Sequence, residues 1–389
     1  MELYILDSNL LRTEVVESYA SLIWTERYQG YGDFQLDIDP VLADTPLTQQ
    51  DTMLAIDKSD RVMYIDSVEN KFQEDGTRLL IVKGKSLEAK LQERPNGYPA
   101  NSNTPLVFGN GTSQTPGTIA RNLITSILRT NASFVNDQMP FLQADSYSAT
   151  GRIAEASDTP IIQSSVGDLY STIKSICETY RLGFRIRRPL DDSKLYFDIY
   201  TGYDRTSGQA TLPAVVFSTQ LDNLTDTTEL ITGENYKNIA YVFALNGSLL
   251  VYGDNADSNT AGFNRKVLVV DANDIADAAG STLTAKMTQR GKEALAAARI
   301  AMGFDGQIPQ NGSYKYGTDY FLGDLVEKRS DTGIITQMRV TEQIFTSDHE
   351  GEKSYPTLVI DTLLTAGSWD AVSAAKYWDI YTTEVWDSM

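Results

Sequence analysis

The feature that most constrains the fold is a pair of alternating segments between Ser21 and Ile38. In the first segment, Leu22 and Trp24 alternate with polar residues. A glycine-bearing turn follows, and the second segment again has an apolar residue at every other position, namely Phe34, Leu36 and Ile38. A period of two on both sides of a glycine turn predicts a β-hairpin with one buried face. The chain therefore opens with a β-rich pattern.

Length and charge limit the class of protein. With 389 residues, the chain exceeds the size at which one core keeps growing, so we expect two to four domains. Hydrophobic residues make up 41% of the chain, which suffices for such cores. The 52 acidic and 33 basic residues give a net charge of −19. This excess argues against a nucleic-acid binder, because Lys and Arg supply most of that affinity.

Cysteine usage and hydropathy exclude further classes. A single cysteine, Cys177, allows no internal disulfide and no thiolate metal site. The sequence has no apolar run of about eighteen residues, so we expect no membrane insertion by this chain. Glu2 and Asp7 stand where a signal peptide would carry basic residues. These features fit a protein made in a bacterial cytoplasm and built into a particle.

Strand and helix patterns alternate along the first half of the chain. Residues 1–95 are β-patterned and predict a first β domain, which the segment 205–235 is a candidate to complete. A stretch rich in Pro, Gly and Asn then marks a boundary. Apolar helical faces near 119–128 and 169–180 predict a mixed α+β domain over 96–204.

The second half of the chain returns to β structure. We expect a second β domain over 236–365 with an inserted helix at 284–303, followed by an extended C-terminal tail over 366–389. The segments 51–82 and 324–360 align as two similar three-stranded patterns with small gaps. Any two meanders of three strands would align about as well, so the alignment alone leaves a repeat and a coincidence open.

Four short motifs, in one order along the chain, resemble a known family. They are SLIWTERYQGYGDFQLDI from Ser21, the Tyr236-Lys237-Asn238-Ile239 segment, the strand Phe321-Leu322-Gly323-Asp324-Leu325-Val326, and the closing strand Glu352-Lys353-Ser354-Tyr355-Pro356-Thr357. The chain resembles the siphovirus tail-tip or baseplate hub proteins, which are minor tail proteins of actinobacterial phages. The resemblance implies an α+β, β-rich fold with two similar antiparallel β-barrel domains.

The same resemblance implies a function. Three chains would form a homotrimeric ring with pseudo-sixfold symmetry, which closes the tail tube and joins it to host-contacting proteins. The implied location is the distal end of the virion tail. The implied partners are the distal tail protein, the tape-measure protein and other tail-tip proteins, with phage DNA passing through without specific binding.

Residues suited to catalysis are sparse or uninformative. The one histidine, His349, lies in a predicted turn, where a metal site would lack fixed ligands. Acidic pairs such as Asp191 with Asp192 and Asp37 with Asp39 are abundant, and none is placed in an apolar pocket that would tune its pKa. We therefore expect no catalytic residue, no metal and no cofactor. The alternatives are a tail-associated cell-wall or polysaccharide hydrolase and a carbohydrate-binding receptor module.

The C-terminus carries the candidate binding residues. Three of the four tryptophans lie there, each followed by aspartate: Trp369-Asp370, Trp378-Asp379 and Trp386-Asp387. Their spacing of nine and eight residues puts the first two on opposite faces of any continuous helix. Tryptophan is enriched at binding hot spots, so we expect these residues to contact a partner subunit or another tail-tip protein. The alternative is a tail folded back onto its own domain.

Overall fold

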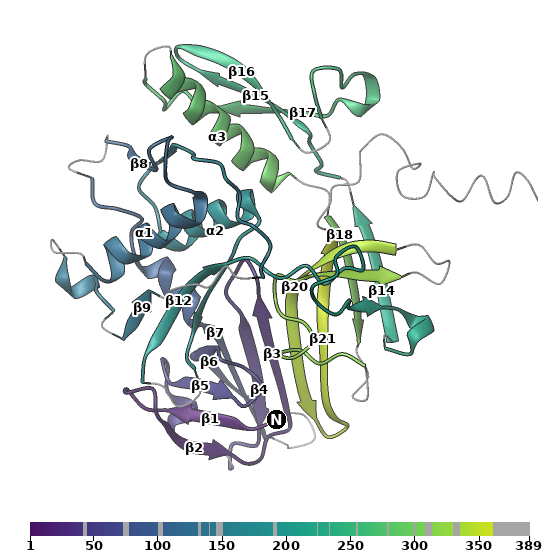
Figure 1. The fold of residues 1–389 in the computed structure, drawn as a ribbon. Coiled ribbons are helices and arrows are strands. Elements are labelled where there is room, and N and C mark those ends of the chain that lie inside the picture. Colours follow the sequence, from purple (N-terminus) through teal and green to yellow (C-terminus); the bar gives the residue numbers. More distant parts are fainter. Residues whose placement is uncertain are drawn as a thin grey trace, which may run out of the picture.

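The fold is α+β and rich in β-strands. The computed structural model describes residues 1–41, 45–72, 78–99, 104–130, 134–139, 141–144, 151–189, 193–223, 225–232, 234–253, 256–277, 280–298, 301–307, 313–329 and 335–360. Figure 1 shows the strands from the beginning and the end of the chain side by side, with the α-helices gathered above them.

The first β block holds the N-terminal strands. They are β1 (Leu3–Leu6), β2 (Arg12–Val16), β3 (Ser21–Arg27), β4 (Asp33–Ile38), β5 (Met53–Ile56), β6 (Val62–Phe72) and β7 (Arg78–Ser86). The predicted hairpin is present as β3 and β4, where Trp24 lies opposite Phe34. Its alternating apolar side chains are buried in one core with residues of β1, β5, β6 and β7. The period of two in the sequence is therefore the buried face of this sheet.

The helical part follows the first β block. Its strands are β8 (Leu106–Phe108), β9 (Leu142–Ala144), β10 (Ile162–Ser164), β11 (Gly183–Arg187) and β12 (Leu195–Tyr200), and its helices are α1 (Pro116–Leu128) and α2 (Leu169–Tyr180). Thr115 and Asp168 cap α1 and α2 by accepting hydrogen bonds from the backbone N–H groups of Thr118 and Ser171. Helix α2 ends at Arg181, whose φ of 56° is left-handed.

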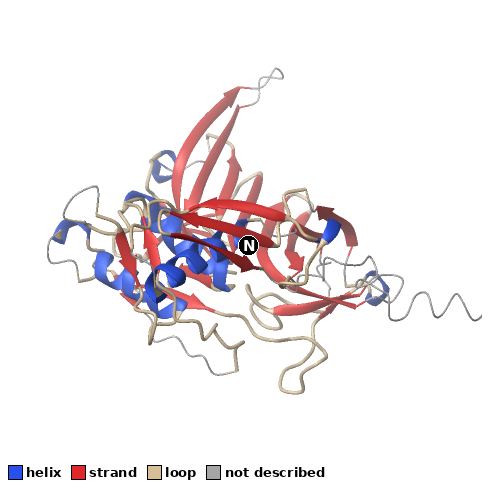
Figure 2. Cartoon of the chain, turned by 90° about the horizontal axis from the view of Figure 1, so that it is seen from above, coloured by secondary structure: helices blue, strands red, loops and turns tan. Residues whose placement is uncertain are grey.

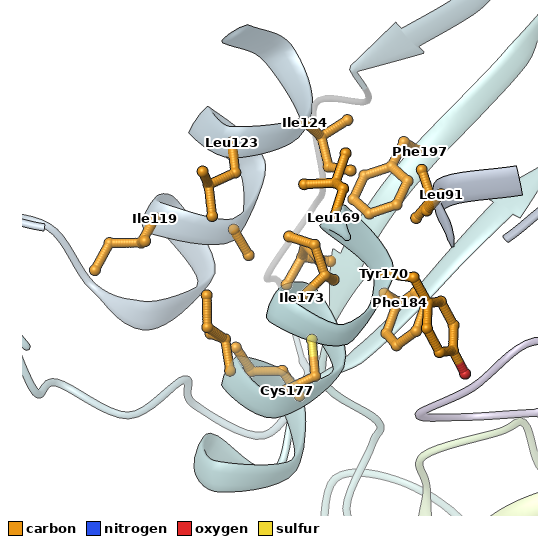
Figure 3. Packing of buried hydrophobic residues seen from close by; sticks show 14 of the residues in the cluster. Leu91, Ile119, Leu123, Ile124, Leu169, Tyr170, Ile173, Cys177, Phe184 and Phe197 are labelled. Carbon is orange, nitrogen blue, oxygen red and sulfur yellow. The ribbon is translucent and has the colours of Figure 1, made fainter. Parts of the chain in front are cut away.

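One apolar core joins α1 and α2 to the sheet of β11, β12 and β9. Figure 3 shows Ile119, Leu123 and Ile124 of α1 facing Leu169 and Ile173 of α2, with Phe184 and Phe197 from the strands behind them. The predicted helical faces are therefore the buried ones. Cys177 belongs to this core and is fully buried.

A third unit combines one helix with a small sheet. Strands β15 (Ile239–Ala244), β16 (Gly247–Tyr252) and β17 (Val267–Asp271) form their own sheet, and α3 (Ser281–Ala297) packs on it. Gly291 permits this close approach, because a Cβ there would lie 2.5 Å from Val251 Cγ2. The helix expected at 284–303 is thus found earlier, and its predicted last turn is instead the start of strand β18 (Ala301–Gln307).

The second β block holds the last strands of the described chain. They are β13 (Val216–Phe217), β14 (Thr225–Thr232), β18, β19 (Leu325–Arg329), β20 (Ile335–Asp348) and β21 (Gly351–Ile360). Strand β13 pairs with β19, and β14 pairs with β18. The segment 205–235, expected as a completion of the first block, thus contributes its strands to the second block.

Both blocks belong to one continuous sheet. Its strand order is β14-β18-β21-β20-β3-β4-β7-β6-β5-β1-β2, with β19 and β13 branching from β20. Strand β20 pairs with β21 on one edge and with β3 on the other, so it joins the blocks. The order has two open ends in the described residues, and the two expected barrels are therefore not seen as closed barrels here.

The aligned segments of the two blocks share their strand pairing. Strands β5-β6-β7 and β19-β20-β21 are both antiparallel meanders. Met63 of β6 lies opposite Leu54, and Met338 of β20 lies opposite Val326. Each middle strand then has a bulge two residues further on, between Ile65 and Ser67 in β6 and between Val340 and Glu342 in β20. A shared bulge at one register position is a specific feature of a strand pair, so the two meanders are equivalent.

A left-handed residue precedes the first strand of each meander. Asp51 has a φ of 62°, and Gly323 has a φ of 90°. The N–H of Asp51 donates to the carbonyl of Ile65 (2.9 Å), and the N–H of Gly323 donates to the carbonyl of Val340 (2.8 Å). The equivalence of the two meanders therefore extends to the turn that enters each of them.

Five 3-10 helices complete the described secondary structure. They are η1 (Thr45–Thr48), η2 (Leu87–Glu93), η3 (Val135–Asp137), η4 (Thr219–Leu221) and η5 (Gly262–Asn264). Figure 2, seen from above, shows most helical residues gathered on one side of the molecule. No helix in the part of the chain that the structure describes is long and apolar enough to cross a membrane.

Candidate functional site

Among the described residues, the catalytic candidates of the sequence are not gathered into one site, and Asp191 and Asp192 lie outside the described residues. His349 lies in the exposed turn between β20 and β21, beside Asp348, which accepts a hydrogen bond from the N–H of Glu350 (2.8 Å). Within the described residues, no group of three His, Cys, Asp or Glu side chains could hold a metal ion. Burial raises the pKa of the Cys177 thiol, so this residue is a poor nucleophile.

Glu26 is a buried carboxylate whose environment invites comparison with a catalytic acid. Burial raises its pKa, and it is 2% exposed. Its oxygens accept hydrogen bonds from Ser59 Oγ, from Trp24 Nε1 (3.3 Å) and from Tyr316 Oη (3.2 Å). These donors come from three segments of the chain, so Glu26 holds the two β blocks together.

Charged pairs attach the helical part to the first β block. Arg61 is buried against Glu88, and Glu88 Oε1 also accepts a hydrogen bond from the backbone N–H of Ile186 (2.7 Å). The dense basic patch at the β11 hairpin faces an acidic neighbour, since Arg185 Nε and Arg187 Nε each lie 2.9 Å from Asp198 Oδ2. These cations are therefore used within the fold.

The Gly-Asp motif before β19 has a structural explanation. Asp324 is fully buried and accepts hydrogen bonds from the N–H of Tyr203 (2.7 Å), from Arg205 Nε (2.8 Å) and from the N–H of Phe321 (3.0 Å). The aspartate thus anchors the segment at 203–205 to the second block. A carboxylate with three donors tolerates such burial.

Tyr28 marks the point where three parts of the molecule meet. Its hydroxyl lies within hydrogen-bond distance of the carbonyls of Arg181 (3.0 Å) and Tyr200 (3.2 Å) in the helical part. A Cβ at Gly183 would lie 2.1 Å from Tyr28 Cε2, and a Cβ at Gly323 would lie 2.4 Å from the same atom. Glycine at both positions therefore makes room for one buried ring.

The junction between the two β blocks is a seven-residue strand pairing. Residues Ser21–Arg27 of β3 run antiparallel to residues 342–348 of β20, and Trp24 lies opposite Phe345. Both aromatic side chains are buried in the core of the first block. A strand of one block thus completes the sheet of the other.

Two strand edges elsewhere in the same sheet are open among the described residues. The segment Ser67–Phe72 of β6, which we call the outer segment of β6, pairs with β7 alone among the described strands. Phe72 at its end is 67% exposed. Strand β14 pairs with β18 alone among the described strands and forms one end of the large sheet. Open edges present unpaired N–H and C=O groups, which can bind a further strand.

The sequence did not point to these edges, because pairing between distant strands has no local signature. The alignment of 51–82 with 324–360 was the signal that could have found them, once extended to the strands beside each meander. The tryptophan tail residues Trp369, Asp370, Trp378, Asp379, Trp386 and Asp387 lie outside the described residues. Their role in partner binding stays a prediction.

Comparison with known proteins supports a phage origin. No curated protein matches the chain in sequence. The sequence model of one family, described as Siphovirus ReqiPepy6 Gp37-like protein, matches residues 2–358.

Solved structures share the fold at low sequence identity. The 43 kDa tail protein of prophage MuSo2 from Shewanella oneidensis has a TM-score of 0.55 at 14% identity, over 92% of this chain and 98% of that protein. The tail protein from Neisseria meningitidis MC58 has a TM-score of 0.56 at 13% identity, over 94% and 98% of the two chains. The prophage tail protein gp18 from Listeria monocytogenes has a TM-score of 0.50 at 9% identity, over 96% and 98%.

Proposed function

Because the chain belongs to the Siphovirus ReqiPepy6 Gp37-like family, we propose that it is the structural hub of a bacteriophage tail tip. Three copies form a ring that closes the distal end of the tail tube and joins it to host-contacting proteins. The observation that carries this proposal is the pair of equivalent meanders in one sheet. Its partners are the distal tail protein, the tape-measure protein and other tail-tip proteins.

The repeat gives the trimer a mechanical purpose. Each chain carries two equivalent β blocks, so three chains present six. A trimer of this kind matches a tail tube with six subunits per ring while using only three copies of the chain. In the assembled ring, a strand of the adjacent β block closes each block into a barrel.

The composition supports passage of DNA without binding. The net charge of −19 predicts a channel lined by acidic or neutral side chains, since a lysine-rich wall would bind phosphates and slow transit. A map of the assembled ring with a wall dominated by Arg and Lys would contradict this part of the proposal.

Mass and symmetry test the ring directly. The purified full chain is measured by light scattering, and virions are imaged by electron cryomicroscopy without imposed symmetry. We expect a trimer, with segments 51–86 and 323–360 at equivalent radial positions in the tail tip. A chain that is monomeric both in solution and in virions would overturn the proposal.

A hydrolase is the alternative that deserves a direct assay. The buried carboxylates of the described chain are all engaged by donors that hold the structure together; they are Glu26, Glu88, Asp198, Asp324 and Glu327. We therefore expect no clearing when the purified chain is tested on host cell walls by zymography. Clearing by the wild-type chain that is lost in the Glu26→Gln variant would establish an enzyme instead.

A further inference from the structure

The equivalence of the two meanders extends to the next strand on one side. In the first block, β4 pairs with β7, and Phe34 lies opposite Gly84. In the second block, β18 pairs with β21, and Phe304 lies opposite Leu358. Gly84 and Leu358 are the partners of Ile65 and Val340, which directly precede the two bulges. Strand β18 therefore occupies the place of β4.

The correspondence continues to a fifth strand. Trp24 of β3 lies opposite Phe34 of β4, and Glu229 of β14 lies opposite Phe304 of β18. Both pairs are antiparallel. Strand β14 is thus the counterpart of β3, and Thr232 occupies the register position of Arg27.

The two open strands correspond to the two strands that pair in the internal junction of the chain. Within the chain, β3 pairs with β20 after the bulge, from Glu342 onward. The counterpart of β3 is β14, and the counterpart of this part of β20 is the outer segment of β6. Each of these two is paired on one edge only in the described part of the chain. One chain therefore contains one complete block junction and the two separate halves of a second one.

The two halves stand at different places in the large sheet of one chain. Six strands stand between β14 and β6 in the large sheet, namely β18, β21, β20, β3, β4 and β7. No strand pair of the described chain joins β14 to the outer segment of β6. The outer segment of β6 in another molecule can therefore complete the half that β14 offers.

We propose that β14 of one copy adds to the outer segment of β6 of the next copy, in the register of the internal β3 and β20 junction. This proposal rests on the trimeric ring proposed above and specifies the strands that join its copies. Transferring the internal register places Thr232 opposite Ser67, Ile231 opposite Val68 and Glu229 opposite Asn70 of the neighbour.

A second copy fits these edges better than a foreign chain. The contact is heterologous, with one edge of each copy binding the other edge of the next, and such contacts close into rings when the rotation allows. The two joined edges occupy equivalent positions in the two blocks. Three copies would therefore form a ring in which junctions within a chain alternate with junctions between chains, all with the same strand pairing. Backbone hydrogen bonds along five residue pairs would satisfy the open edge groups.

Paired cysteines test the register. Residues directly opposite in an antiparallel pair have Cα atoms about 4.5–5.5 Å apart, which a disulfide can bridge. The double variant Val68→Cys with Ile231→Cys should therefore form disulfides between chains under mild oxidation, and a denaturing gel should show dimers and trimers. Cys177 stays in place because it is fully buried.

The matched control shifts the register by one residue. Val68→Cys with Leu230→Cys puts the second thiol on the opposite face of β14, so at least tenfold less product is expected. Co-expression of the two single variants, Val68→Cys and Ile231→Cys, should give dimers that contain one chain of each kind. A reducing gel and circular dichroism confirm intact chains and unchanged folding.

The outcomes separate this inference from the proposed function. A trimer that crosslinks through Val68→Cys and Ile231→Cys, but not through the shifted pair, supports both. A trimer without the in-register crosslink, in solution and in virions, overturns the strand pairing and leaves the ring intact. A chain that is monomeric in both settings and does not crosslink overturns the ring and the strand pairing together.

Discussion

Arg27 Nε on β3 donates a 2.6 Å hydrogen bond to Oε1 of Glu342 on β20, across 315 positions of sequence. The same guanidinium lies 2.5 Å from Asp33 Oδ2, so one cation serves both β blocks. Arg27 and Glu342 are 32% and 29% exposed. The ion pair thus lies at the margin of the junction, where solvent only partly screens it.

A double-mutant cycle should measure this junction contact. We expect Arg27→Ala, Glu342→Ala and the double variant to give a coupling energy of about 0.5–1 kcal/mol in urea unfolding. The coupling should shrink in high salt. A matched cycle on the exposed pair Lys174 and Glu178, which lie 3.6 Å apart on α2, should give less. Equal coupling in the two cycles would show that the junction pair adds nothing of its own.

Gly183→Ala should destabilise the protein by about 1–3 kcal/mol, as overpacking of a buried site does. The added methyl group would meet the Tyr28 ring at 2.1 Å. Thermal unfolding followed by circular dichroism measures the loss. Gly208→Ala is the control, because its nearest neighbour lies at 3.7 Å and little change is expected there. Similar melting of both variants would refute the packing role of Tyr28.

The stability of the fold should contain a component that is lost as pH rises. Burial raises the pKa of Glu26 above its ordinary 4.5. The folded chain therefore holds a proton that the unfolded chain releases, and stability falls as pH rises through the raised pKa. In Glu26→Gln this component is absent, so the wild-type advantage in melting temperature should be larger at pH 5 than at pH 8. The exposed Glu17→Gln is the control. A wild-type advantage in melting temperature that grows with pH would contradict this argument.

Changing Trp369, Trp378 and Trp386 together to Ala should leave a soluble, folded chain that fails to enter the particle. The expected cause is the loss of aromatic anchors that fill pockets on a neighbouring subunit or tail protein. Immunoblots of purified virions measure incorporation, and far-ultraviolet circular dichroism of the free chain checks folding. Infectious virions with normal amounts of the triple variant would rule out a docking tail, and an unfolded chain would favour a tail that is part of the fold.

Local patterns predicted local structure well. The alternation around Trp24 predicted the hairpin of β3 and β4, and the apolar face near 169–180 predicted α2. The helix predicted to end at 303 stops at Ala297, because the apolar period continues into a strand that pairs with β14 and β21. In a short apolar run, periodicity cannot distinguish the last turn of a helix from the start of a strand.

Long-range pairing was beyond the sequence. Nothing near Ser21 indicates that its strand meets Asp348, since backbone pairing between distant segments depends on the whole fold. The Gly-Asp motif was recognised by resemblance, but its reasons appear only in three dimensions: Gly323 makes room for Tyr28, and Asp324 binds Arg205. Sequence patterns report the buried face of a strand and leave its neighbours undetermined.

Strand β3 is translated long before β20, the strand that covers its free edge. Strand β3 leaves the ribosome early, yet the strand that covers its free edge ends at Asp348. At about 5–20 residues per second, translation of the intervening 315 or so residues takes roughly 16–60 seconds. During that interval the nascent chain carries an uncovered strand edge, which other nascent chains on the same message can reach. An uncovered strand edge is a template for pairing with another chain, so this interval is when the N-terminal sheet is most exposed to association between nascent chains.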